Sequence, residues 1–311
     1  MNPILRRILW RLVAGIGVLW AAASLTFVAI NLTSGDLALT ILGGGDSLPT
    51  PEVLARVRAE YHLDRPIPEQ YIIYVGKLLR GDFGESYHLR IPVTKAIAQQ
   101  IRPTIELAVT GGSFAVVTAI VIAVLTARRS RWVRSAASGS ELIVSSIPAI
   151  VIGIGLLLVF SFYFDLLPSS GQDGWKTLVL PTFMVAIPLI TNLSQVLRNE
   201  LEEVLEQPFI TTARARGLSD AGVRLGHALR HALIPLITLS GFIFGNLLGG
   251  AVFAESLFAR QGVGRLMSTA AGNKDVPLVL GVTMLAAATY VVVHLVVDLL
   301  NAFIDPRVKT T

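Results

Sequence analysis

The chain has 311 residues, of which 53% are hydrophobic and 15% charged, and its mean hydropathy is +0.65. This apolar content exceeds what a soluble globular core needs, so the composition argues against a water-soluble enzyme. Lys and Arg exceed Asp and Glu by a formal charge of +5. The absence of Cys excludes disulfides, thiolate catalysis and Cys-bound metals.

Six apolar runs without Asp, Glu, Lys or Arg follow one another along the chain. They cover residues 12–32, 107–127, 142–164, 177–197, 232–254 and 276–297. Each has the roughly 20 residues needed to cross a bilayer as a helix, and each is apolar on all sides. The fold class predicted is therefore an all-α polytopic membrane protein with six transmembrane helices. The length of the first run favours a retained span over a cleaved signal peptide.

The basic residues indicate how these spans are oriented. With the N-terminus inside, the inner segments contain Arg6, Arg7, Arg11, Arg128, Arg129, Arg131, Arg134, Arg198, Arg214, Arg216, Arg224, Arg230, Arg307 and Lys309. The short outer loops contain Lys176, Arg260, Arg265 and Lys274. The positive-inside rule therefore predicts that both termini are cytoplasmic. Anionic membrane lipid, and not nucleic acid, is then the expected counterpart of the positive charge.

Residues 33–106 form a long connection that we expect outside the cytoplasm. Thr50 and Pro51 are placed to cap and start a helix that reaches Tyr61. A second helix is expected to begin near Pro68 and to end at Gly81. The chain is thus divided into residues 1–32 with the first span, a small helical extracytoplasmic segment at 33–106, and a core at 107–311 with a cytoplasmic loop at 198–235.

The cytoplasmic loop carries the clearest local signals. Pro208 can open a short helix that extends to Ala215, and Gly217 can take the left-handed conformation that ends it. Ser219 can cap the helix that follows and leads into the fifth span. These signals predict a helix–turn–helix that presents one short helix outside the membrane.

That short helix has side chains suited to contact another surface. Phe209, Ile210 and Ala213 give it an apolar edge, and Arg214 and Arg216 can pair with carboxylates. Such a helix fits a groove in another protein, but an amphipathic helix lying on the inner leaflet has the same composition. The residues alone leave both alternatives open.

The loop also carries a family resemblance. TTARARGLS at 211–219 and HALRHALIP at 227–235 closely resemble the EAA loop of ABC-importer permeases, in the version typical of dipeptide and oligopeptide systems. The same family is similar at 63–66 (LDRP), 81–84 (GDFG), 262–265 (GVGR) and 305–307 (DPR), so the likeness covers essentially the whole chain. The resemblance is to the B-type subunit, and it implies a type I ABC importer permease fold in a bacterial inner membrane.

The resemblance also implies a mechanism and partners. The EAA loop would dock into a cytoplasmic ATPase and convert its closure into alternating access for peptides or peptide-like solutes. The positions that match the coupling region are Phe209, Thr212, Ala213, Arg214, Arg216, Gly217, Ser219 and Pro235, the last at the start of the fifth span. The implied partners are a second, C-type permease, one or two kinds of ATPase, and an extracytoplasmic solute-binding protein. ATP and Mg²⁺ would be bound by the ATPases, because this chain lacks G-x-x-x-x-G-K-[ST].

Other functions remain as alternatives. The same machinery serves nickel, metallophore complexes and glutathione in this family. A self-contained secondary transporter is a remote alternative, and Pro181 and Pro188 in the fourth run are compatible with its broken helices. A hydrolase is not supported, since H-E-x-x-H, G-x-S-x-G and Cys are all missing, and no catalytic residue is predicted.

Several intramembrane residues invite a functional or a packing interpretation. A polar substrate path or helix–helix hydrogen bonds would explain Asn192, Ser194, Gln195 and Asn246. His294 and Asp298 lie one turn apart, and we favour a structural pair or snorkelling to the interface over a proton relay or a metal site. Gly241, Gly245 and Gly249 offer a smooth face for a helix of this chain or of a second permease. Arg260-Gln261 stands where the resembled family usually has Trp-Pro.

Overall fold

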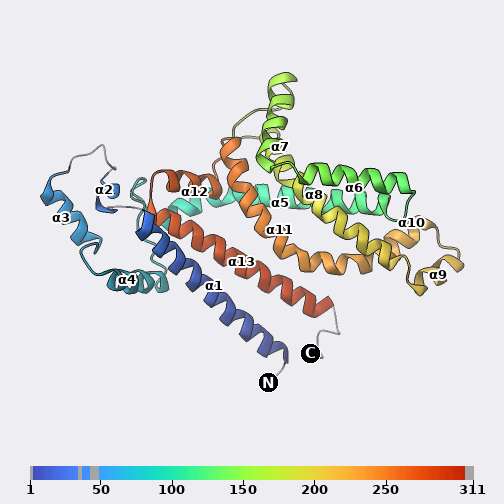
Figure 1. Ribbon diagram of the computed structural model, residues 1–311, viewed down its shortest axis with the longest axis horizontal. Helices are drawn as coiled ribbons and strands as arrows, with labels where there is room; N and C mark the ends of the chain where they lie inside the picture. The colour runs from blue at the N-terminus through green and yellow to red at the C-terminus, as the bar shows by residue number, and fades with distance from the viewer. Residues whose placement is uncertain (1–2, 34–36, 43–48, 305–311) are drawn as a thin grey trace. The chain divides into compact units, whose positions relative to one another are not determined.

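Helices make up most of the part of the chain that the computed structural model describes, which is residues 3–33, 37–42 and 49–304 (Figure 1). Within these ranges the structure describes only the backbone of some residues, including Asn246 and Asp298. The chain divides into two compact units. One comprises Met1–Arg102 and Gly262–Val291, and the other Pro103–Gln261 and Val292–Thr311. We describe each unit by itself.

The first unit is formed by the N-terminal helices and a later hairpin. Its elements are α1 (Pro3–Thr33), α2 (Leu37–Ile41), α3 (Pro51–Glu60), α4 (Ile67–Leu79), the start of α5 (Val93–Thr126), α12 (Val263–Gly272) and most of α13 (Val276–Ile304). Thr50 caps α3, where its Oγ1 accepts from the Val53 amide at 3.4 Å. Gly81 follows α4 with a φ of +74°. Both helices that were predicted between the first two spans are therefore confirmed.

An apolar cluster and a buried carboxylate connect the later helices of this unit to the residues before and at the start of α5. Val93 and Ala96 at the start of α5 pack with Ala270 and Leu278. Asp275 is 1% exposed, and its carboxylate accepts hydrogen bonds from the Ser86 hydroxyl and from the amides of residues 87 and 88. The same carboxylate accepts from the Leu278 amide at 3.4 Å, so one side chain both caps α13 and holds the preceding loop.

Helix α5 begins earlier than the sequence indicates. The second apolar run starts at residue 107, whereas the helix is continuous from Val93 and includes Pro103. Lys95, Arg102 and Glu106 interrupt the apolar pattern, so the uncharged run begins only after them although the helix does not. The boundary between the two units falls at residues 102 and 103, close to the predicted division at 106 and 107.

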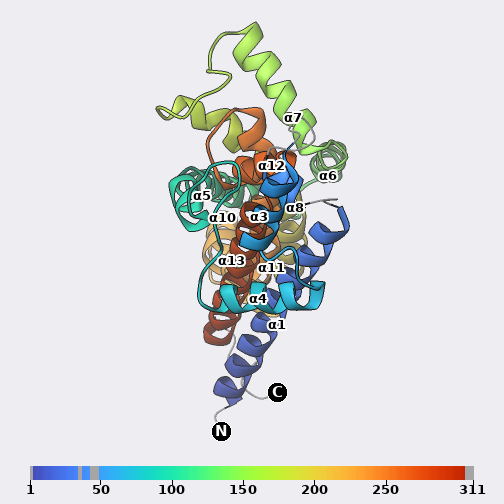
Figure 2. The same ribbon diagram turned by 90° about the vertical axis from the view of Figure 1, so that its left-hand side faces the viewer.

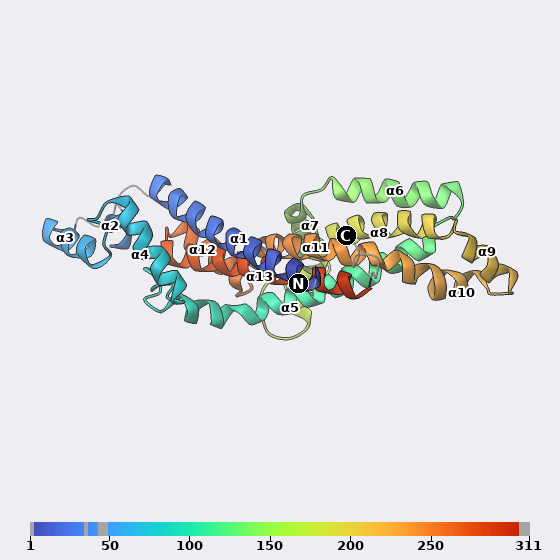
Figure 3. The same ribbon diagram turned by 90° about the horizontal axis from the view of Figure 1, so that it is seen from below.

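The second unit is a helical bundle with α8 at its centre. It contains the remainder of α5, α6 (Arg131–Ser145), α7 (Ala149–Leu156), the π-helical η1 (Leu157–Tyr163), α8 (Lys176–Val204), α9 (Pro208–Ala215), α10 (Asp220–Gly222), the π-helical η2 (Val223–Ala228) and α11 (Leu229–Leu257). Helix α8 packs against α6, α7 and α11, and α6 runs beside it in Figure 3. Their shared apolar core includes Leu180, Met184, Leu193, Leu197 and Leu201.

The third predicted span is not one straight helix. Residues 142–145 belong to α6, and α7 with η1 continues after a bend of 96°. Pro148 causes this break, because proline disfavours helical geometry in the residue before it. The sequence-based boundaries at 142 and 164 are corrected accordingly.

Membrane-spanning candidates follow from length and apolarity. Among the described residues they are Leu9–Ala29, Val93–Thr126, Lys176–Val204 and Val276–Val297, and the bent pair formed by α6 with α7 and η1 adds a fifth if it crosses as one span. The all-helical, polytopic class is confirmed. The number of six spans stays a prediction.

Candidate partner-docking site

The loop at residues 198–235 folds as its local signals indicate. Pro208 starts α9, and the chain leaves the helix through Gly217, whose φ is +83°. Ser219 caps the next helix, where its Oγ accepts from the Gly222 amide at 3.2 Å. A left-handed φ of this size is strained for residues with a Cβ, so glycine suits this turn.

The outward face of α9 differs from the predicted apolar edge. Ile210 and Ala213 are 0% and 6% exposed and pack into the core of their own unit. A helix of eight residues is unstable alone and must bury one face to persist. Among the exposed residues of this segment, Phe209, Thr212 and the C-cap Arg216 follow one another at helical spacing. We call these three residues the α9 face; Ala213 is removed from the surface available to a partner.

A buried arginine fastens this loop to the end of α5. The Arg224 side chain is 6% exposed, and its Nη1 donates to the carbonyl oxygens of Val124 at 3.2 Å and Ala127 at 2.6 Å. These carbonyls lie at the C-terminal end of α5, where the helix has no further backbone amides to donate hydrogen bonds to them. A cation at this position also complements the helix dipole.

A second arginine fastens the same helix end to α8. Arg128 follows α5, and its Nη1 donates to the Leu205 carbonyl at 3.2 Å. Its backbone amide donates to Glu202 at 3.2 Å, and its guanidinium lies 3.6 Å from Glu206. The C-terminal ends of α5 and α8 and the helix that follows α9 are thus cross-connected.

The Asp220 carboxylate lies close to three arginines. It accepts from Arg224 at 2.8 Å and lies 3.7 Å from Arg214 and 4.0 Å from Arg129. The hydrogen bond from Arg224, with the nearby positive charges, holds the pKa of Asp220 below its ordinary value. Arg214 and Arg216 were both expected to pair with carboxylates. Arg214 pairs with Asp220 of its own chain, whereas the structure shows no ion pair for Arg216 among the described residues.

Pro235 lies inside α11, which begins at Leu229, so it follows the start of this helix by more than a turn. Its ring removes one backbone hydrogen bond there.

The polar residues of α8 occupy different environments. The Ser194 side chain is buried and donates to Glu141 at 2.7 Å, so the structure gives it a helix–helix hydrogen bond. Asn192 is exposed and donates to the Pro188 carbonyl at 3.1 Å, and Gln195 is half-buried. The Asn246 side chain lies outside the described residues. The structure does not bring these predicted path residues together at one site.

Sequence reasoning missed a buried ion pair between α6 and α8. The Arg198 guanidinium meets the Glu141 carboxylate in a two-pronged contact, with Nη1 and Oε1 at 2.9 Å, and both side chains are less than 8% exposed. Ser138 also accepts from Arg198 at 3.4 Å. The positions of the two residues in the sequence could have indicated this pair. Glu141 directly precedes the third apolar run and Arg198 directly follows the fourth, so the predicted topology places both on the same side of the membrane.

Arg260, the departure from the resembled family, is also buried. It is 1% exposed, and its guanidinium lies 3.8 Å from Glu106 and donates to Thr177 at 3.5 Å. Burial lowers the pKa of Arg260 while Glu106 and Glu255 oppose the shift. This arginine therefore fixes the chain directly after α11.

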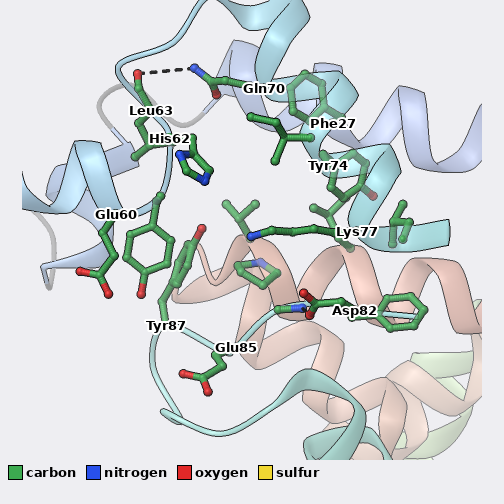
Figure 4. Close-up of a pocket in the computed structure, with 18 of the residues that line it drawn as sticks. Phe27, Glu60, His62, Leu63, Gln70, Tyr74, Lys77, Asp82, Glu85 and Tyr87 are labelled. Atoms are coloured by element: carbon green, nitrogen blue, oxygen red, sulfur yellow. Dashed lines mark hydrogen bonds between the residues drawn. The ribbon is translucent and has the colours of Figure 1, made fainter. Parts of the chain in front are cut away.

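The first unit contains a cavity of about 560 Å³ between α1, α4, the loop after α4 and the start of α13 (Figure 4). In Figure 4, Lys77 extends from α4 towards Tyr87, and His62 lies on the opposite wall. The Tyr74 hydroxyl is buried without a hydrogen-bond partner in the described chain, and burial raises its pKa to about 12. The cavity is thus lined by aromatic, basic and acidic groups together.

Long apolar helices, together with a short exposed helix braced to the ends of two of them, define a polytopic membrane protein of the transporter-permease class. The chain belongs to the family of binding-protein-dependent transport system inner membrane components, whose model matches residues 116–310. It is accordingly an integral inner-membrane component of an ABC transporter.

Two similar proteins extend over nearly the full chain. A Brucella abortus (strain 2308) protein named as a peptide transport system permease is 35% identical over 311 residues, covering 97% of this chain and 98% of the relative. The glutathione transport system permease protein GsiC of Salmonella typhimurium (strain LT2) is 33% identical over 307 residues, covering 98% of this chain and 99% of the relative.

Proposed function

We propose that this chain is the membrane-spanning subunit of an ATP-driven importer that moves peptides or peptide-like solutes into the cytoplasm by alternating access. Similarity to proteins named for peptide and glutathione transport supports this solute class. We assign ATP hydrolysis and Mg²⁺ binding to cytoplasmic ATPase subunits, since the sequence has no phosphate-binding loop. Solute capture is assigned to an extracytoplasmic binding protein.

The bracing of α9 carries the proposal. A helix that only lay on a lipid surface would need no rigid connection to the transmembrane helices. Arg224 instead connects the loop to the end of α5 through two hydrogen bonds, and Arg128 connects that end to the end of α8 through two more. Force applied at the α9 face would therefore reach two long helices without being lost in a flexible loop, which is the requirement for coupling to a moving ATPase.

A second permease subunit is supported by the glycine face of α11. A Cβ added to Gly245 or Gly249 would meet nothing within 4 Å in the described part of the chain. These positions are thus not used for packing against the described helices of this subunit, and small residues allow another helix to approach closely. We propose that this face contacts the sister permease.

The coupling role is tested by reversing charge at Arg214 and Arg216 together. We expect ATP-dependent solute uptake by reconstituted complexes to fall on the order of tenfold or more, because misplaced interface charges cost several kcal/mol. Membrane insertion should be normal, since neither side chain lies in a span. Uptake into proteoliposomes and ATPase activity of the same preparation are the measurements.

Arg131→Glu provides the matched control, because this residue begins α6 on the same predicted side but away from α9. The control should transport normally. Normal uptake by the Arg214→Glu, Arg216→Glu variant would remove the coupling role from this loop. Uptake by the purified chain alone, without ATP, would replace the importer by a secondary transporter.

A further inference from the structure

Helix α4 is attached across the C-terminal part of α1, as Figure 2 shows. The Tyr71 hydroxyl and the Ser24 hydroxyl share a hydrogen bond of 2.6 Å. The Phe27 ring lies 5.4 Å from the ring of Tyr71 and 5.5 Å from that of Tyr74. Two tyrosines of α4 therefore fix its position along α1.

The contact lies at the depth of the membrane, not beyond it. The membrane-spanning candidate in α1 extends to Ala29, so both Ser24 and Phe27 belong to it. At 1.5 Å per residue, Ser24 lies about 7 Å from Ala29 and about 12 Å from Leu32, the last residue of the apolar run. Amphipathic helices that lie in a membrane surface bury their apolar faces by about 5–10 Å. The depth of the contact between α1 and α4 is comparable to this range.

A different face of α4 is apolar and uncovered. Ile72 and Leu79 are 70% and 84% exposed and, two turns apart, point the same way. Glu69 and Arg80 lie on a separate, charged face. Around the helix axis, the Ile72–Leu79 face is adjacent to the one that carries Tyr71 and contacts α1.

Apolar side chains are also exposed on α1 at this level. Leu25 and Val28, which follow Ser24 and Phe27 in the sequence, are 70% and 50% exposed on a helix long enough to cross the membrane. Exposed apolar side chains therefore occur on both helices at the level of their contact. Tyrosines at such a junction are typical of the membrane–water interface.

We propose that α4 is an interfacial helix whose Ile72 and Leu79 side chains insert among phospholipid acyl chains, in the leaflet that surrounds the C-terminal end of α1. Glu69 and Arg80 then lie in the headgroup region. The occupant of the apolar face is lipid, because α4 contacts α1 inside its membrane-spanning segment, where exposed apolar side chains such as Leu25 and Val28 meet acyl chains. The inference rests on the membrane-spanning character of α1 and not on the solute or on the coupling mechanism.

The absence of Cys allows single-cysteine labelling without a prior background substitution. Ile72→Cys and Leu79→Cys test the apolar face, and Glu69→Cys and Arg80→Cys are controls on the charged face. Each variant, in the assembled transporter in lipid nanodiscs, receives an environment-sensitive nitrobenzoxadiazole label. Quenching is measured with phospholipids that carry a nitroxide on the acyl chain and, separately, with aqueous iodide. Val75→Cys replaces either test position if that variant does not assemble.

We expect the nitroxide lipid to quench labels at 72 and 79 several-fold more strongly than labels at 69 and 80, and iodide to show the reverse order. Similar iodide quenching at all four positions would overturn the proposal, because the face would then be in water. Protection of positions 72 and 79 from both quenchers would also overturn it, since a protein subunit would cover the face. Neither reading depends on transport activity.

Discussion

Asp220 shows how a single exposed side chain organises the candidate docking site. Three arginines from separate elements surround its carboxylate, although about half of the side chain is exposed. Arg224 is the decisive partner, because it is buried and simultaneously binds the last carbonyls of α5. Asp220 thus adds a solvent-screened counter-charge to the carbonyl acceptors that Arg224 already has in α5.

The depressed pKa of Asp220 gives a pH dependence with a definite sign. In the folded protein the pKa of Asp220 lies below its ordinary value of 3.8. The ionised carboxylate therefore stabilises the fold fully above pH 3.8, and this contribution is lost as the pH falls through the lower pKa of the folded state. We expect Asp220→Asn to lower the free energy of unfolding by about 1 kcal/mol at most at pH 7, since the side chain is half exposed.

Thermal unfolding of the wild type and the variant between pH 7 and pH 3 measures this effect. The difference between their melting temperatures should be constant down to about the ordinary pKa of 3.8 and shrink below it. A difference that is independent of pH over the whole range would contradict the electrostatic explanation.

At the scale of elements, the ion pair between Glu141 and Arg198 determines how α6 packs on α8. Its side chains are buried, so removal of one partner leaves a charge without compensation. We expect Glu141→Leu to cost roughly 3–5 kcal/mol of stability, and the double variant Glu141→Leu, Arg198→Met to recover most of it. A double-mutant cycle of unfolding free energies provides the measurement.

The exposed pair of Arg65 and Glu69 is the matched control, with 2.6 Å between Nη1 and Oε1 and side chains 44% and 48% exposed. Disrupting it should cost about 0.2–1 kcal/mol. Equal losses from the buried and the exposed pair would show that burial does not govern this contact.

Elements whose ends are encoded locally could be predicted. Helices α3, α4 and α9 each combine a start signal at Thr50, Pro68 or Pro208 with a nearby turn residue, and all three form. Helix α6 could not be found in this way, because its charged residues are compensated by partners on other helices. Its Glu141 is buried only because Arg198, 57 positions away, meets it.

The same limit applies to the docking site. The turn at Gly217 and the cap at Ser219 depend on neighbouring residues and were predictable. The inward orientation of Ala213 depends on a core assembled from several helices, and the contact between Arg224 and Ala127 joins positions 97 residues apart. Local patterns do not encode such pairings.

For the whole molecule, the distribution of arginines predicts that both termini face the cytoplasm. Adding one cysteine at the N-terminus, and in a second variant at the C-terminus, tests this in the Cys-free chain. We expect a membrane-impermeant maleimide to label neither variant in intact cells and both after the membrane is opened. A cysteine that replaces Asp173, in a predicted outer loop, should react in intact cells and serves as the positive control.

The π-helical turn η2 separates the docking loop from α11. A π turn holds about one more residue than an α turn, and each residue of an α-helix advances the side chains by about 100°. The side of α11 that faces its neighbours is therefore offset in phase from the side that an uninterrupted helix would present. Loss of one residue within 223–228 would convert η2 to an α turn and rotate α11 relative to the α9 face, so insertions and deletions here change register and not merely length.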